Sequence, residues 1–243
     1  MFNWSLFFIV VFACVPGILV SIPNSIKTIR RLAQDTKSSE QTLPPIPVLT
    51  AVAIVQSLIL FAIPAAVGTA VAHRVGLHAP FFEALVNGEP LWPAIAPQLG
   101  PAVGMGVAGA LVFVLAYYSF FRPRLDTVTV QRMEALRNDL GIAGRLLYGG
   151  IAEEVLARWG LMSLFAWLGS LLIGNATPAV MWSAIVISGL LFGLGHAPSY
   201  LAAGCIKSPM FFAAMICLNL WASLVFGWLF WHYGLLSAMI AHM

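Results

Sequence analysis

The chain has 243 residues, of which 60% are hydrophobic and only 9% are charged, and its mean hydropathy is +0.93. Soluble domains carry about a quarter charged residues, so this composition excludes an ordinary soluble domain and indicates an integral membrane protein. The formal net charge of +3 does not indicate nucleic-acid binding, because the basic residues lie between long apolar segments, as charges that orient membrane helices do.

Apolar segments long enough to cross a membrane follow one another along the whole chain. A helix needs roughly 20 apolar residues to cross the hydrocarbon core. Segments of this length predict six transmembrane helices, at 5–22, 47–71, 99–120, 146–172, 179–197 and 209–231. A seventh begins near Gly234 and is cut off at Met243, after some 15 Å of a core of roughly 30 Å. We therefore expect an all-α, polytopic transmembrane helix bundle, one domain over residues 1–243, with six full spans and a truncated seventh.

The basic residues predict the orientation of these helices. The first connection carries Lys27, Arg30, Arg31 and Lys37, and the third carries Arg122, Arg124, Arg132, Arg137 and Arg145, whereas the second has Arg74 alone. Loops rich in Lys and Arg face the cytoplasm, so the N-terminus is expected to face outward, in the cell (inner) membrane if the source is bacterial. The first apolar segment has no basic start and no cleavage signal, which favours a retained helix over a signal peptide.

Two connecting segments and the cysteines complete the pattern. The outer segment 73–97 mixes aromatic residues with Glu and Pro, and we expect it at the membrane interface. Residues 127–140 have apolar positions at helical spacing among charges, which predicts a surface helix on the cytoplasmic side. Cys14, Cys205 and Cys217 form no CxxC pair, and we expect them to be packing residues.

Glu153, Glu154 and Arg158 are the only charged residues well inside a predicted span. Ionisable groups at the bilayer centre cost at least a few kcal/mol each, so they need partners or a function. Glu154 and Arg158 are four residues apart and can pair on a helix. Glu153 then lies about 100° away on a regular helix, on a face of small residues that a neighbouring helix can approach closely: Gly149, Gly150, Ala157 and Gly160. A structural ion cluster is the alternative to a catalytic role, but it leaves one carboxylate unpaired.

The next helix ends in a histidine. Phe192 and His196 are four residues apart, and Pro198 is expected to stop the helix just after the imidazole. His196 and Glu153 are then predicted at similar depth below the cytoplasmic surface. A carboxylate and an imidazole that share a water are typical of hydrolases, although a lone membrane histidine more often only packs helices together.

The remaining histidines differ in position. His242 shares a helical face with Gly234 and is predicted near mid-bilayer. His232 is flanked by Trp231 and Tyr233, which is typical of the interface. The two others, His73 and His78, fall in the outer segment, away from the predicted site.

Three short motifs therefore occur in order in successive helices: Glu-Glu-x-x-x-Arg (Glu153, Glu154, Arg158), Phe-x-x-x-His (Phe192, His196) and Gly-Leu-x-Ser-Ala-x-x-x-His (234–242). The set resembles the CPBP family, intramembrane proteases related to the type II CAAX prenyl endopeptidase and to bacteriocin-processing and self-immunity proteins. The resemblance covers about residues 146–243, and hydropathy alone matches the first three helices.

The resemblance implies an intramembrane endopeptidase whose site opens towards the cytoplasm. Glu153 and His196 would activate a water for attack on a peptide carbonyl, Glu154 and Arg158 would hold the site in shape, and His242 would stabilise the oxyanion. The implied partners are the lipid bilayer and a peptide or protein substrate, prenylated or otherwise membrane-bound. The chain has no HExxH motif, so no cofactor is required, but zinc or another divalent metal at Glu153, His196 and His242 stays open.

One departure keeps other functions open. The family's third motif continues to Asn or Asp four residues after its histidine, and this sequence stops at Met243. Asn219 is a substitute donor, with an interhelical hydrogen bond as its favoured role. The alternatives are a non-catalytic membrane scaffold or bacteriocin self-immunity protein, and a proton-coupled transporter, for which no inverted repeat is seen.

Overall fold

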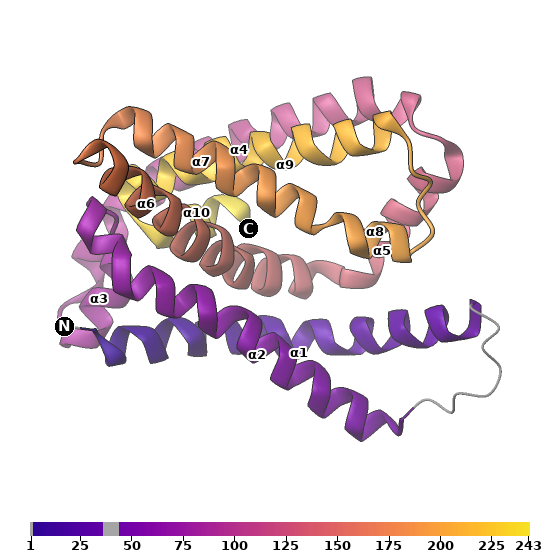
Figure 1. Cartoon of the computed structure of the whole chain (residues 1–243), viewed down its shortest axis with the longest axis horizontal. Coiled ribbons are helices and arrows are strands. Elements are labelled where there is room, and N and C mark those ends of the chain that lie inside the picture. Colours follow the sequence, from indigo (N-terminus) through magenta and orange to yellow (C-terminus); the bar gives the residue numbers. More distant parts are fainter. Residues whose placement is uncertain (1, 36–43) are drawn as a thin grey trace.

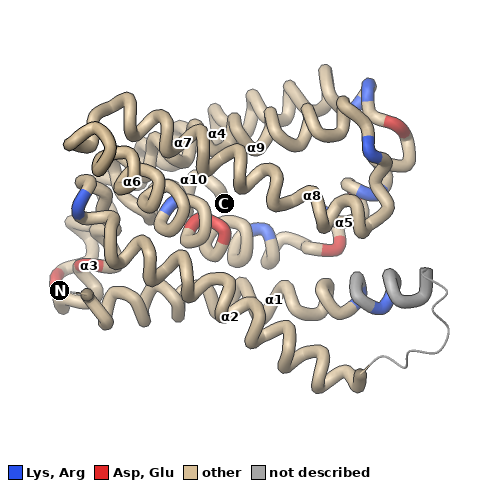
Figure 2. The backbone as a smooth tube through the Cα atoms, in the orientation of Figure 1, with Lys and Arg blue, Asp and Glu red and all other residues tan. Residues whose placement is uncertain are grey.

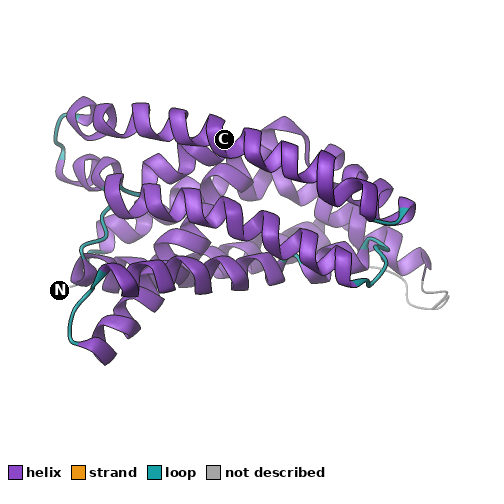
Figure 3. Cartoon of the chain, turned by 90° about the horizontal axis from the view of Figure 1, so that it is seen from above, coloured by secondary structure: helices purple, strands orange, loops and turns teal. Residues whose placement is uncertain are grey.

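The computed structural model describes residues 2–35 and 44–243, and all regular secondary structure in these ranges is helical (Figure 3). Within them six helical segments are long and apolar enough to cross a membrane: Trp4–Lys27, Ile46–Val75, Leu91–Arg124, Thr127–Ile173, Pro178–Ala202 and Pro209–Tyr233. The predicted all-α membrane bundle with six spans is therefore confirmed. Lys37, counted above in the first basic connection, lies outside the described residues.

The long helices are joined by short helical turns. In chain order the α-helices are α1 (Trp4–Asp35), α2 (Ile46–Val71), α3 (Pro80–Asn87), α4 (Leu91–Ala116), α5 (Thr127–Gly144), α6 (Ser163–Ile173), α7 (Pro178–Gly195), α8 (Ala197–Ala202), α9 (Pro209–Tyr233) and α10 (Leu235–His242). Two segments are 3₁₀-helical, η1 (Ala72–Val75) and η3 (Arg122–Arg124), and three are π-helical, η2 (Tyr117–Phe121), η4 (Arg145–Glu153) and η5 (Val155–Met162).

The π-helical segments η4 and η5 run through the middle of the bundle. Figure 1 shows α1 and α2 along one side and α4, α7 and α9 along the other. Segment η4 contacts α1 and α10, and η5 contacts α2 and α7. Large apolar side chains on the outer faces of α1, α2 and α4 are exposed, as expected of surfaces that meet lipid: examples are Phe12, Ile63 and Leu115.

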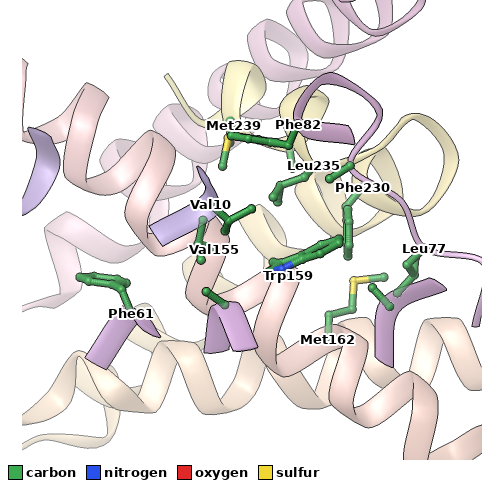
Figure 4. Close-up of a cluster of buried hydrophobic side chains, with 14 of the residues drawn as sticks. Val10, Phe61, Leu77, Phe82, Val155, Trp159, Met162, Phe230, Leu235 and Met239 are labelled. Carbon is green, nitrogen blue, oxygen red and sulfur yellow. The ribbon is translucent and has the colours of Figure 1, made fainter. Parts of the chain in front are cut away.

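The main core forms around Trp159 of η5 (Figure 4). Its indole meets Phe230 of α9 with 6.2 Å between ring centroids. Two glycines allow α2 to approach this core. A Cβ on Gly68 would lie 2.3 Å from the Trp159 carbonyl oxygen, and one on Gly160 would lie 2.2 Å from Cβ of Pro64. The close helix contact predicted for Gly160 is therefore confirmed.

Several helices begin at residues suited to that position. Asp126, Thr177 and Ser208 each accept a hydrogen bond from the backbone N–H three residues on, at the starts of α5, α7 and α9. The hydrogen bonds from Thr129 lower the pKa of the Asp126 carboxyl. Pro178 and Pro209 occupy the first turn of their helices, where a missing N–H costs nothing.

The outer segment differs from its prediction. Helix α4 begins at Leu91 instead of near residue 99: Pro93 lies in its first turn, where proline is tolerated, and the helix continues through Pro97 and Pro101. Leu77 and Phe82 are buried in the main core, so this segment packs on the bundle and does not simply lie at the interface. The predicted surface helix at 127–140 is confirmed as α5. Gly141, with φ 66°, separates its straight part from the spanning segment that follows.

Candidate functional site

The site residues come from η4, η5, α7, α9 and α10. Figure 2 shows acidic and basic positions together in the middle of the bundle, close to the C-terminus, whereas most other charged positions lie towards its two ends. Glu153 ends η4, Glu154 follows it and η5 begins at Val155. The regular α-helix expected here is wrong: the backbone has the wider π winding, which often occurs at functional sites.

Glu154 and Arg158 form the ion pair predicted from their spacing. Arg158 Nε lies 3.2 Å from Glu154 Oε2, and the two side chains are only 3% and 0% exposed. Arg158 Nη2 also donates to Ser223 Oγ of α9 at 3.0 Å. The guanidinium lies 5.8 Å from the ring centroid of Phe192 and 5.4 Å from that of Phe226. The guanidinium is thus held by the Glu154 carboxylate, one hydrogen bond and two aromatic rings, which compensate its burial.

His242 binds the same carboxylate from the other side. Its Nδ1 lies 2.7 Å from Glu154 Oε1, and its ring stacks on Phe226 at 4.8 Å. This contact turns the second nitrogen, Nε2, away from Glu154. An added Cβ at Gly149 would lie 3.5 Å from that Nε2 and 3.8 Å from Glu153 Oε2. The free nitrogen of His242 and the carboxylate of Glu153 therefore face the same small space.

Glu153 and His196 form the more accessible half of the site. Glu153 Oε1 is 4.0 Å from His196 Nε2, and the two side chains are 20% and 28% exposed. Nδ1 of His196 lies 2.9 Å from the Phe192 carbonyl oxygen, which favours the tautomer that leaves a lone pair on Nε2. A separation of 4.0 Å exceeds a direct hydrogen bond and suits one water that contacts both groups. The predicted meeting of these two helices at one depth is confirmed.

Phe192 links the two halves of the site. Its ring lies edge-on to His196, with 4.7 Å between centroids, and its face lies near the Arg158 guanidinium. Ser223 and Phe226, which the sequence analysis did not single out, also belong here, together with Gly149, which it placed on the face of small residues beside Glu153. Ser223 holds Arg158, Phe226 holds the His242 ring, and Gly149 leaves space between Glu153 and His242. Ser223 and Phe226 follow Asn219 by four and seven residues and so lie on the same face of that helix. This spacing is the feature of the sequence that could have identified them.

The other candidates lie elsewhere. His232 is exposed and stacks on Trp228, and His78 lies near Glu83 of α3, as their sequence contexts predict. Asn219 Nδ2 donates to the Met215 carbonyl within its own helix, so the predicted interhelical hydrogen bond is wrong. Cys14 and Cys205 are buried and unpaired, which confirms them as packing residues, whereas Cys217 is exposed.

The described residues contain no group of three His, Cys, Asp or Glu side chains arranged to hold a metal ion. Of the set considered above, His242 turns Nδ1 to Glu154 and keeps Nε2 free on the side of Glu153, and Glu153 lies 4.0 Å from His196. The arrangement can nevertheless polarise a water, since a carboxylate and a neutral imidazole flank one position.

The comparisons with known proteins agree with the motifs. No curated protein and no solved structure matches the chain. One protein-family model matches residues 140–243, and its description is "Type II CAAX prenyl endopeptidase Rce1-like". The match covers η4 to α10 and so includes every residue of the candidate site. It confirms the resemblance predicted from the three motifs for this part of the chain, which is similar to the Rce1-like type II CAAX prenyl endopeptidases.

Proposed function

We propose that this protein hydrolyses a peptide bond inside the membrane with a water activated by Glu153 and His196. The observation that carries the proposal is the 4.0 Å separation of Glu153 Oε1 and His196 Nε2 on two accessible side chains. Glu153 takes the proton as the water attacks the peptide carbonyl, and His196 orients the same water through Nε2. No metal is needed for these steps.

The other motif residues hold and complete this pair. Arg158 and Glu154 form a buried anchor, and Glu154 fixes the ring of His242 through Nδ1. With Nδ1 held, His242 presents Nε2 to the space beside Glu153. In the protonated form of the ring, this nitrogen donates to the oxyanion that develops on the carbonyl oxygen. The tetrahedral intermediate then collapses, and the proton on Glu153 passes to the leaving amine.

The substrate enters from the membrane face that carries α5 and the connection after α8. This end holds Arg122, Arg124 and Arg132, which is the pattern of a cytoplasmic face. A peptide tethered to the membrane, such as a prenylated CAAX protein, reaches a site at this depth without leaving the bilayer. The family description supports a CAAX-type substrate as the first to test.

The experiment compares Glu153→Gln with the wild type in proteoliposomes. The probe is a farnesylated peptide that ends in a CAAX sequence, and mass spectrometry identifies the products. We expect Glu153→Gln to lower the cleavage rate about 10³-fold, because general-base catalysis contributes roughly 10²- to 10⁴-fold. Glu89→Gln, an exposed carboxyl in the outer turn, serves as the matched control and should cleave normally.

Cleavage that persists in purified Glu153→Gln protein would exclude Glu153 as the base. A wild-type protein that binds the peptide but never cleaves it, with unchanged binding in Glu153→Gln and His196→Ala, would favour the non-catalytic scaffold or self-immunity function instead. Equal activity before and after treatment with a chelator is expected, since the proposed steps use no metal.

A further inference from the structure

A second charged group lies near the site and has no role in the steps above. Arg137 of α5 is half-buried, and its Cζ lies over the ring of Tyr117 at 5.1 Å from the centroid. The neighbouring Arg122 is already paired, since its Nε donates to Glu134 Oε1 at 2.9 Å. Among the described side chains no carboxylate lies within ion-pair distance of Arg137. This part of the molecule therefore has an excess of positive charge.

Tyr117 adds an unused donor next to this charge. The residue is 1% exposed, and its hydroxyl has no hydrogen-bond partner among the described residues. Buried hydroxyls are normally hydrogen-bonded, and an unpaired one is energetically costly. A buried phenol without a partner beside a guanidinium without a carboxylate is the local environment expected of an anion site.

Tyr200 connects this region to the catalytic pair. Its ring lies nearly parallel to His196, with 6.4 Å between centroids, and edge-on to Phe211 at 6.1 Å. The hydroxyl of Tyr200 is within electrostatic range of both Arg137 and Glu153. Helix α5 is fixed to the chain after α8, because Ile206 N donates to Thr129 Oγ1 at 2.9 Å (Figure 1).

We propose that Arg137, together with Tyr117, binds a carboxylate of the peptide substrate, and that Tyr200 forms the wall between this subsite and Glu153. The proposal rests on the proposed function and names the chemistry of its substrate. The planar guanidinium suits a carboxylate, with which it makes two parallel hydrogen bonds. The carboxylate is that of the substrate's C-terminus or of an acidic side chain on the same side of the scissile bond.

The test measures binding and not cleavage, so that it is independent of the proposed chemistry. Glu153→Gln protein in phosphatidylcholine nanodiscs is titrated with three farnesylated CAAX-type peptides. The first has a free C-terminal carboxylate, the second is its amide, and the third is an amide with Glu as the last residue. We expect the first to bind about 10- to 100-fold more tightly than the second, the effect of a charge-assisted hydrogen bond. Binding of the third as tightly as the first would assign the subsite to a side-chain carboxylate.

Arg137→Gln should abolish the difference between acid and amide and leave the affinity for the amide unchanged. Arg137→Lys should retain part of the difference between acid and amide, because lysine keeps the positive charge but cannot form the two parallel hydrogen bonds. The matched control is Arg132→Gln, an exposed arginine of the same helix, which should keep the full difference. Near-native melting temperatures of the variants would show that α5 remains folded.

Equal affinity for acid and amide, including failure to bind either, would overturn the proposal. The proposal is also overturned if Arg137→Gln weakens the binding of acid and amide equally and does so only in nanodiscs that contain anionic lipid. The ligand of Arg137 is then a lipid headgroup. If only the proposed function is wrong, the results differ. The wild type then cleaves no peptide, but the protein still binds the acid more tightly than the amide, and this difference still depends on Arg137.

Discussion

Each of the two adjacent glutamates has a different environment. Glu154 is fully buried and shared by Arg158 and His242, whereas Glu153 is partly exposed and lies 4.0 Å from His196. A carboxylate held by two cationic or donor groups is poorly suited to exchange protons with a water. Glu153 lacks such fixed partners, which suits it to act as the base.

The first prediction at the residue scale concerns the buried ion pair. Glu154→Gln leaves the Arg158 guanidinium in the interior without its carboxylate and should destabilise the protein by about 3–5 kcal/mol. Glu154→Gln combined with Arg158→Met removes both charges and should recover part of this loss. Thermal unfolding in detergent measures both. If the single variant melts like the wild type, Arg158 has another partner and the anchor role of Glu154 is wrong.

The second prediction concerns the space between Glu153 and His242. The methyl group of Gly149→Ala would sit 3.5 Å from His242 Nε2 and 3.8 Å from Glu153 Oε2, in ordinary contact with both. The protein should fold normally but cleave roughly 10- to 100-fold more slowly, because water and substrate are displaced. Gly100→Ala on α4, where an added Cβ meets nothing within 4 Å, is the matched control and should retain full activity.

The residues of the candidate site could be singled out from the sequence, but their pairing could not. Spacing of four residues identified the Glu154–Arg158 pair, and the rarity of charge inside the spans identified Glu153. Spacing contains no information on which carboxylate His242 meets, because that depends on how α10 packs against η4. The role of Gly149 was hidden for the same reason, since a small residue on a helix face indicates either close packing or open space.

At the scale of elements, the π winding of η4 and η5 was not predictable. The sequence there has no proline that would indicate a change from α-helical hydrogen bonding, and Gly149 and Gly150 permit either form. Most ends of the spans were predicted within about five residues, because each span needs enough apolar length to cross the bilayer, whereas the fourth spanning segment begins at Thr127, since it includes α5. Helix α4 also begins earlier than expected, since prolines in its first turns look like loop residues in a sequence.

The third prediction concerns the contact between α2 and η5. In Gly160→Ala the new Cβ would lie 2.2 Å from Cβ and 2.8 Å from Cα of Pro64, atoms of a rigid ring and backbone that cannot move aside. We expect a loss of about 1–3 kcal/mol in stability and lower activity, because η5 carries Arg158. Gly104→Ala on α4, where an added Cβ meets nothing within 4 Å, is the control for thermal unfolding. A variant as stable as this control would show that α2 is free to separate from η5.

At the scale of the whole molecule, sequence predicted the membrane bundle and the number of spans because hydropathy alone determines them. It did not predict that the outer segment packs into the core, since burial of Leu77 and Phe82 depends on neighbours distant in sequence. The arrangement places the turns η1 and α3 at one end of the bundle and α5 with α8 at the other (Figure 1).

The fourth prediction tests the orientation of this bundle. In a background in which Cys14, Cys205 and Cys217 are replaced by Ala, single cysteines are introduced at Glu89 or at Arg124. A maleimide that cannot cross membranes should label the first in intact cells and the second only after permeabilisation, because basic connections face the cytoplasm. The reverse pattern would place the candidate site near the outer surface and contradict entry of a cytoplasmic substrate.

The partners of Glu154 also bear on how the chain enters the bilayer during synthesis. His242 is 88 residues away from Glu154 in sequence, and Ser223 is 65 residues from Arg158. A ribosome therefore delivers the acidic pair to the translocation machinery long before the imidazole or the hydroxyl has been made. Of these partners, Arg158 alone has been synthesised when the segment with the two carboxylates enters the membrane. It can neutralise one of them, which lowers the free-energy cost of moving this segment into lipid. Its first contribution is then to biogenesis, ahead of any chemistry in the finished protein.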